Sequence, residues 1–196
     1  TVEHLVYGFQ KVFGDRYEVL RYASASCPPV LGYSEPDTPN CPANVETFLT
    51  DIIAANKYDL VVISSTSRWG PFAEGFPETA RRLDAAGIPY VMIGQIPYFD
   101  EPPADIIARL PEGADIREAL RSRMQVGCDG SERGVDKLVP ADRFFSMENF
   151  ICDGGYPRYE MNGQLIHKDH VHLNALGSML AARAIKEWLL ETGNNP

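Results

Sequence analysis

The chain has 196 residues, of which 44% are hydrophobic and 23% charged, so it can bury one sizeable core and is predicted to form a single domain over residues 1–196. Its formal net charge of −9 argues against a nucleic acid or an anionic membrane surface as partner, because both attract basic patches and the sequence has no basic run. No apolar segment approaches the roughly 20 residues that span a bilayer, and no signal-peptide pattern is present.

The first half of the chain alternates helical patterns with short apolar runs. Leu5, Phe9 and Val12 recur at helical spacing, and Gly14 follows them as a stop signal. The run at 58–65 is nearly continuous and rich in β-branched residues, which is typical of a strand buried on both faces of a parallel sheet. The predicted elements up to residue 94 are helices at 3–13, 43–57 and 77–87, with Pro77 near the start of the last, and strands at 17–23, 58–65 and 88–94.

The second half ends in a long helix. Asn174 is its predicted N-cap, and an apolar stripe follows over residues 175–191. Asn162-Gly163 between β-type residues predicts a small hairpin at 159–167. The remaining predicted elements are helices around 103–110 and 113–125 and a strand or strand-like edge at 142–147.

Helices alternating with short buried strands predict an α/β fold, a doubly wound sandwich with a mostly parallel sheet. In such sheets, functional sites form in the loops beyond the carboxyl ends of the strands. The loops that qualify are 23–42, 64–76 and 94–102.

The four cysteines, Cys27, Cys41, Cys128 and Cys152, allow three pairings, and none has the CxxC spacing of a zinc or redox site. Cys27 and Cys41 enclose a loop rich in turn residues that has little core of its own. We therefore favour a disulfide closing this loop, in an oxidising compartment, over four free thiols in the cytosol. That pairing leaves Cys128 and Cys152 as the second pair.

The segment "HKDHVHLNALG" at 167–177 contains three histidines and Asp169 just before the final helix. The spacing of His167, His170 and His172 does not place three imidazoles on one face, so we expect no metal site. Asp169 lies three residues before His172, and a single turn can bring its carboxylate to the ring. Such a pair can act as a general base with its orienting group. Alternatively, the two side chains belong to a polar loop and only satisfy hydrogen bonds of the backbone.

The continuation into a final helix favours the catalytic interpretation. "DHVHLNALGSMLAARAI" resembles the last conserved block of the SGNH/GDSL hydrolase superfamily. The stretches at 23–33, 41–53, 58–75 and 91–99 are similar in order and spacing to the SGNH domains attached to membrane-bound polysaccharide O-acyltransferases, the acyltransferase family three. This resemblance spans nearly the whole chain and implies a three-layer α/β/α sandwich.

The resemblance also implies a nucleophilic serine in a GDS motif, and no GDS occurs in the 196 residues. "TVEHLVYGF" is similar to the residues that follow this motif, and the chain starts at Thr1 instead of Met. We therefore expect a chain truncated at its N-terminus, without the first strand and the serine, and inactive as it stands. The serines at 64, 65 and 67 are interpreted as hydroxyls that cap a turn, because none lies at a strand-to-helix elbow.

Other site residues follow from the resemblance. Ser24 and Ser26 occupy the loop where the superfamily has oxyanion-hole donors. Arg68 and Trp69 match an "RW" of the acyltransferase-linked domains, where other SGNH enzymes have an Asn. Arg68 would bind substrate or stabilise charge, and Trp69 would stack on a sugar or simply pack.

The implied function is O-acyl transfer, chiefly of acetyl, to carbohydrate hydroxyls of cell-surface or exported polysaccharide through a serine acyl-enzyme. Asp169 would orient His172, and no metal or organic cofactor is expected. The expected partners are an acyl donor, a carbohydrate acceptor and a membrane acyltransferase domain, in the periplasm or elsewhere outside the cytoplasm, with tethering through a segment not in this chain. The alternatives are a soluble SGNH esterase and an inactive glycan-binding module. His4 is expected on the surface of the first helix, and His167 at the end of the hairpin; neither is given a role.

Overall fold

A computed structural model describes residues 3–23, 27–33, 36, 38–55, 58–64, 69–130, 137–194 and 196. At its centre lies a parallel sheet with the order β1-β2-β5, formed by Val61–Ser64, Tyr90–Ile93 and Phe144–Phe145. Val61 pairs with Tyr90 and Met92 with Phe144. The predicted α/β class with a mostly parallel sheet is therefore confirmed for the central strands.

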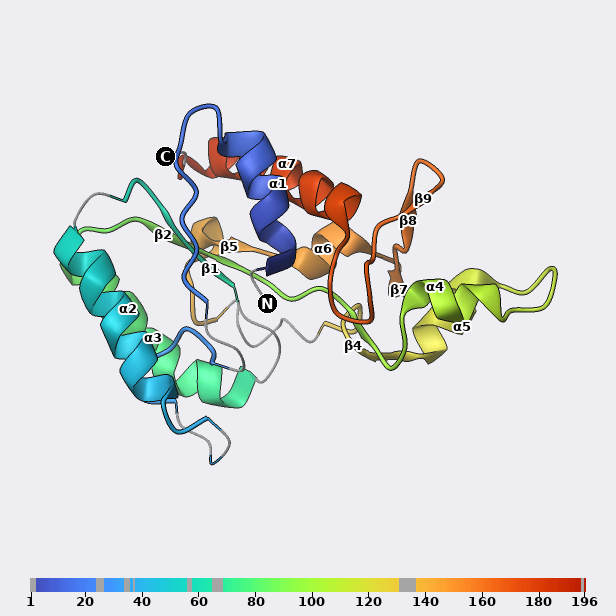
Figure 1. Ribbon diagram of the computed structural model, residues 1–196, viewed down its shortest axis with the longest axis horizontal. Helices are drawn as coiled ribbons and strands as arrows, with labels where there is room; N and C mark the ends of the chain where they lie inside the picture. The colour runs from blue at the N-terminus through green and yellow to red at the C-terminus, as the bar shows by residue number, and fades with distance from the viewer. Residues whose placement is uncertain are drawn as a thin grey trace.

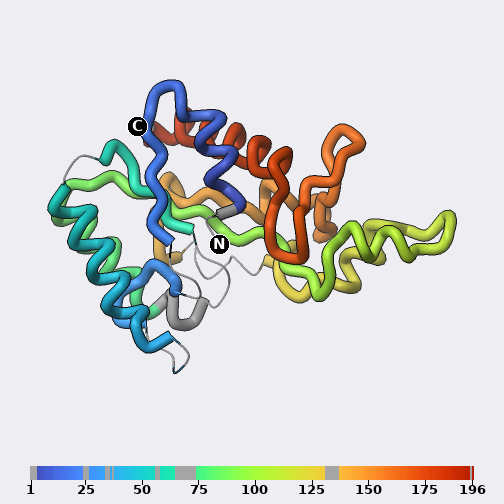
Figure 2. The backbone as a smooth tube through the Cα atoms, in the orientation of Figure 1, coloured from blue at the N-terminus to red at the C-terminus, as the bar shows by residue number. Residues whose placement is uncertain are grey.

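Helices cover both faces of this sheet (Figure 1). One layer holds α1 and α7, and the other holds α2 and α3, as the backbone path in Figure 2 also shows. These helices are α1 (Glu3–Phe13), α2 (Cys41–Ala55), α3 (Trp69–Ala85) and α7 (Ala175–Thr192). No helix in the described ranges is long and apolar enough to cross a membrane.

The alternation of side chains along β2 divides the interior into two cores. Tyr90 and Met92 belong to the core beneath α2 and α3, whereas Val91 and Ile93 belong to the core beneath α1 and α7. All four residues are buried. Successive strand side chains point to opposite faces, so a strand covered on both sides is apolar throughout.

A small lobe extends from one end of the sandwich (Figure 1). Its core is Phe99, Ile106 and Leu120. The lobe and the segments that join it to the sheet contain short elements: β3 (Tyr98–Phe99), α4 (Pro103–Ala108), α5 (Ile116–Ser122), β4 (Met124–Val126), η2 (Ala141–Arg143), α6 (Met147–Ile151), β6 (Cys152–Asp153), β7 (Tyr156–Pro157), β8 (Glu160–Met161) and β9 (Gln164–Leu165). The predicted hairpin is β8–β9, and Asn162 and Gly163 both have the positive φ that its tight turn requires.

The middle of α1 packs closely against the first turn of α7. A Cβ atom at Gly8 would lie 2.1 Å from the Ser178 carbonyl oxygen, so only glycine fits there. The Gly8 N–H donates to Ser178 Oγ at 2.8 Å. At the start of α7 the Asn174 side chain accepts from the Gly177 N–H at 3.0 Å, as expected of an N-cap.

Some predicted elements are wrong in type or extent. β4 occupies the end of the helix predicted at 113–125, and η2 and the start of α6 occupy part of the strand predicted at 142–147. Residues 17–23 form no strand, because they pair with none of the strands in the described part of the chain. The helix predicted at 77–87 begins at Trp69 and has Pro77 in its interior. Burial of Phe76, which is 0% exposed, is consistent with tertiary packing overriding the helix-breaking tendency of Pro77.

Both expected disulfides are present. Cys27 is bonded to Cys41, and Cys128 to Cys152. The first bond holds the start of the loop at 27–33 against the first residue of α2. The second ties the end of β4 to β6, so it links the small lobe to the segment after α6.

Candidate active site

A tightly closed loop between β9 and α7 carries the candidate catalytic residues. His167 and Leu173 form an antiparallel bridge at its two ends. Inside it, the Lys168 N–H donates to the His172 carbonyl oxygen at 2.8 Å. Backbone bonds across the loop fix its shape, so the side chains at 169 and 172 have a defined relative position.

Asp169 and His172 are in direct contact. His172 Nδ1 lies 2.8 Å from Asp169 Oδ2 and 3.0 Å from Oδ1. Asp169 Oδ1 also accepts the backbone N–H groups of Val171 and His172, both at 2.9 Å. One carboxylate therefore shapes the turn and holds the ring. A carboxylate on Nδ1 selects the tautomer in which Nε2 can accept a proton.

The charge on Asp169 is stabilised by these contacts. Partial burial opposes ionisation, but the hydrogen bonds from Val171 and His172 hold the pKa of the carboxyl below its ordinary value. The Asp169 side chain is 31% exposed and that of His172 27%, so the pair is accessible from solvent. The arrangement can stabilise an imidazolium on His172.

His4 contacts this pair, contrary to its expected place on the surface of the first helix. Its ring centroid lies 5.6 Å from that of His172, with the planes tilted by 57°. Burial lowers the pKa of His4 to about 3, so its imidazole is neutral. Its Nδ1 has no hydrogen-bond partner among the described residues. The i, i+4 spacing to Gly8, which marks the tightly packed face of α1, is a sequence signal for this burial.

The other two histidines of the segment serve as packing residues. His167 is 7% exposed and meets Phe99 edge to face, and burial lowers its pKa to about 4. His170 contacts the ring of Tyr98 in the same way. Within the ranges that the structure describes, no group of three metal-ligating side chains is close enough to hold an ion.

The remaining predicted site residues are not placed by the structure. Ser24, Ser26 and Arg68 lie outside the described residues. Trp69 begins α3, but its side chain is also outside the described part. Ser64, interpreted as a turn hydroxyl, is the last residue of β1 and is 8% exposed. The structure therefore unites Asp169, His172 and the unforeseen His4, at the N-terminal end of α1.

Comparisons with known proteins show the family and the fold of the chain. The model of the family described as "SGNH domain (fused to AT3 domains)" matches residues 2–187. The solved periplasmic domain of a lipopolysaccharide acetyltransferase from Salmonella ser. Paratyphi A has the same fold, with a TM-score of 0.68 and 15% sequence identity over 96% of this chain and 78% of that chain. No curated protein matches the chain.

Proposed function

Because the chain belongs to the family of SGNH domains fused to AT3 domains, we propose that it transfers acyl groups, chiefly acetyl, to carbohydrate hydroxyls of an exported or cell-surface polysaccharide. The transfer proceeds through a serine acyl-enzyme. The acyl donor and the carbohydrate acceptor are its substrates.

The contact between Asp169 and His172 carries this proposal. Asp169 holds Nδ1 at 2.8 Å, which leaves proton exchange to Nε2. The depressed pKa of Asp169 keeps the carboxylate charged next to an imidazolium. These are the properties that a base and its orienting group need when a hydroxyl attacks an acyl carbon.

The reaction has two balanced steps. In the first, the serine hydroxyl attacks the acyl carbonyl while His172 takes its proton, which then goes to the departing donor group. In the second, the acceptor hydroxyl gives its proton to His172 and attacks the acyl-serine, and His172 returns the proton to the serine. With water in place of the acceptor, the same two steps make an esterase.

We place the nucleophilic serine on a strand that precedes α1 in the full-length protein. Such a strand would lie beside β1, which is at the edge of the described sheet and whose Val61 and Val62 are only partly buried. It would also cover residues 17–23, where Leu20 is 47% and Tyr22 39% exposed. Both features support a further strand beside these segments in the full-length protein.

The substrate contacts that we assign to Ser24, Ser26, Arg68 and Trp69 rest on the family. Ser24 and Ser26 would donate hydrogen bonds to the oxyanion, next to the anchored Cys27. Arg68 would bind or stabilise negative charge, and Trp69 would stack on a sugar ring. In the sequence, Ser24 and Ser26 follow the segment 17–23, and Arg68 and Trp69 follow β1, where α/β sheets form their sites.

We place the domain in the periplasm or another extracytoplasmic compartment, beside a membrane acyltransferase domain. Two disulfides, Cys27–Cys41 and Cys128–Cys152, favour an oxidising environment. The family description, "fused to AT3 domains", supports the association with an acyltransferase.

The experiment compares acetyl transfer by the full-length protein with that by its His172→Ala variant, with acetylated polysaccharide as the readout and released acetate as the control product. We expect the variant to lose activity by about 10³-fold or more. Acetate release without polysaccharide acetylation would assign an esterase. Glycan binding with no turnover in either protein would assign an inactive binding module.

A further inference from the structure

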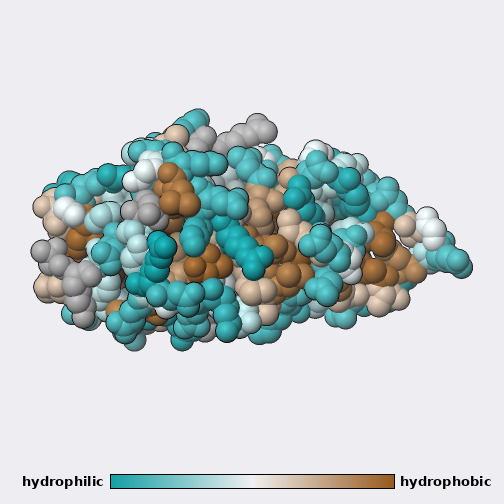
Figure 3. Space-filling view, turned by 90° about the horizontal axis from the view of Figure 1, so that it is seen from above, coloured by the Kyte–Doolittle hydropathy of each residue, from teal (hydrophilic) through white to brown (hydrophobic). Residues whose placement is uncertain are grey.

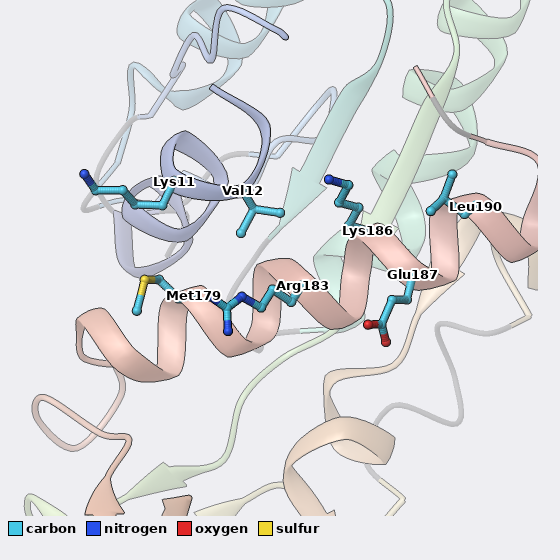
Figure 4. Close-up of a pocket in the computed structure, with 7 residues that line it drawn as sticks. All are labelled: Lys11, Val12, Met179, Arg183, Lys186, Glu187 and Leu190. Carbon is cyan, nitrogen blue, oxygen red and sulfur yellow. The ribbon is translucent and has the colours of Figure 1, made fainter. Parts of the chain in front are cut away.

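A groove between α1 and α7 is lined by more cations than carboxylates, although the protein as a whole is acidic. Lys11 and Val12 of α1 line it, together with Met179, Arg183, Lys186, Glu187 and Leu190 of α7. Figure 4 shows Lys11 on one helix and Arg183 and Lys186 on the other. The groove thus combines three cations and one carboxylate in a chain whose net charge is −9. The sequence has no basic run because these cations come from opposite ends of the chain.

The three cations differ from most arginines of the protein in their surroundings. Arg82, Arg123 and Arg143, for example, each form an ion pair with a carboxylate. Lys11, Arg183 and Lys186 are exposed and form no ion pair with any carboxylate in the described part of the chain. Their charge is therefore available to an anionic ligand.

Apolar surface lies beside these charges. Leu190 is 56% exposed, and Tyr7 is 42% exposed with its ring 5.8 Å from Lys11 Nζ. Figure 3 looks onto this side of the molecule, where hydrophobic side chains lie among hydrophilic ones. Aromatic and aliphatic groups suit the C–H faces of sugar rings, and cations suit carboxylates. A groove also fits a linear chain better than a flat bilayer.

The groove and the candidate active site share one face of α1. His4, Gly8 and Lys11 lie on one face of α1, and His4 contacts His172. Two helical turns, about 10 Å, separate Lys11 from His4 along the helix axis. A saccharide chain in the groove can thus extend toward the site of acyl transfer.

We propose that the groove between α1 and α7 binds acidic saccharide, with Lys11, Arg183 and Lys186 contacting the carboxylates of the acceptor chain. This inference rests on the proposed acyl transfer to polysaccharide. It specifies the acceptor as a glycan that bears carboxylates along its length.

The test measures binding of an oligogalacturonate to the protein by calorimetry, with a neutral maltooligosaccharide of equal length as the comparison. Lys11→Glu combined with Lys186→Glu should weaken oligogalacturonate binding at least tenfold. Lys137→Glu combined with Arg158→Glu changes the net charge equally at exposed positions outside the groove and should leave binding unchanged. Thermal unfolding checks that both variants fold.

Several results would overturn the proposal. One is that the two double variants bind oligogalacturonate equally well. Another is that the protein binds the neutral oligosaccharide as tightly as oligogalacturonate. A third is that it binds phosphatidylglycerol vesicles but not oligogalacturonate. Because no turnover is measured, such a result leaves the role of His172 in acyl transfer to be judged separately.

Discussion

At the scale of single residues, Asp169 performs two tasks with one carboxylate. It accepts two backbone N–H groups of its own loop and holds the His172 ring through Nδ1. The contact was predictable from the sequence because the partners are three positions apart and a turn brings them together. The neighbour His4 was placed wrongly, because its contact with His172 depends on how α1 packs against α7.

Replacement of Asp169 by Asn separates the two tasks. The amide oxygen can still accept the backbone N–H groups, but an amide N–H facing Nδ1 favours the wrong tautomer of His172. We expect acetyl transfer by the full-length protein to fall by about 10³–10⁴-fold, while the melting temperature changes little. A matched decrease in activity and melting temperature would instead make Asp169 a structural residue only.

His4 is predicted to act as a positioning residue for His172. His4→Ala removes the ring that packs against His172 and should lower kcat/KM for acetyl transfer about tenfold. His4→Phe keeps a ring without a titrating group and should restore most of the activity, because burial already keeps His4 neutral. If the Ala and Phe variants were equally impaired, ring packing at this position would not explain the effect.

At the scale of elements, the long helices and buried strands were predictable and the short pairs were not. Residues 3–13 form a helix as predicted, and Asn174 caps the last one, because periodicity and a capping side chain are local signals. Strands such as β6 and β7 have only two residues, too few to show a period. Residues 17–23 have β-type sequence but no partner strand in the described structure.

The two disulfides should have similar effects on stability and different effects on function. Their loops span 14 and 24 residues, so replacing either pair by serine should lower the free energy of unfolding by about 3 kcal/mol. Loss of Cys27–Cys41 should also raise KM or lower kcat, because Ser24 and Ser26 precede Cys27 directly. Urea unfolding and acetyl-transfer kinetics of the two double variants provide the comparison. Equal kinetic effects would argue against a role for residues 24–26.

At the scale of the whole molecule, one segment joins the candidate active site to the small lobe. The loop at 167–173 carries Asp169 and His172 and at the same time joins the small lobe to the core, because the Phe99 N–H donates to the His170 carbonyl oxygen at 3.0 Å. The family and the fold class were predictable from the order of motifs along the chain. The basic groove was not, since charges distant in sequence form it.

Acid should destabilise the folded protein through His167. Folding lowers the pKa of this buried ring from 6.5 to about 4, so between these values the unfolded chain binds more protons. Stability is therefore lost as the pH falls from 6.5 toward 4, by about 3 kcal/mol for this group. In urea unfolding, His167→Phe should reduce the loss of unfolding free energy between pH 7 and 4.5. The buried His4 should account for part of the pH dependence that remains. An unchanged pH dependence in the variant would contradict this assignment.

The central claim is that a serine supplied by the full-length protein forms an acyl-enzyme with the help of Asp169 and His172. Intact-mass spectrometry after rapid mixing of the full-length protein with p-nitrophenyl acetate tests it most directly. We predict one acetyl group on a serine N-terminal to α1 and no detectable adduct in the His172→Ala variant over the same time. An adduct that forms equally fast without His172, or that lies on a different residue, would contradict the claim.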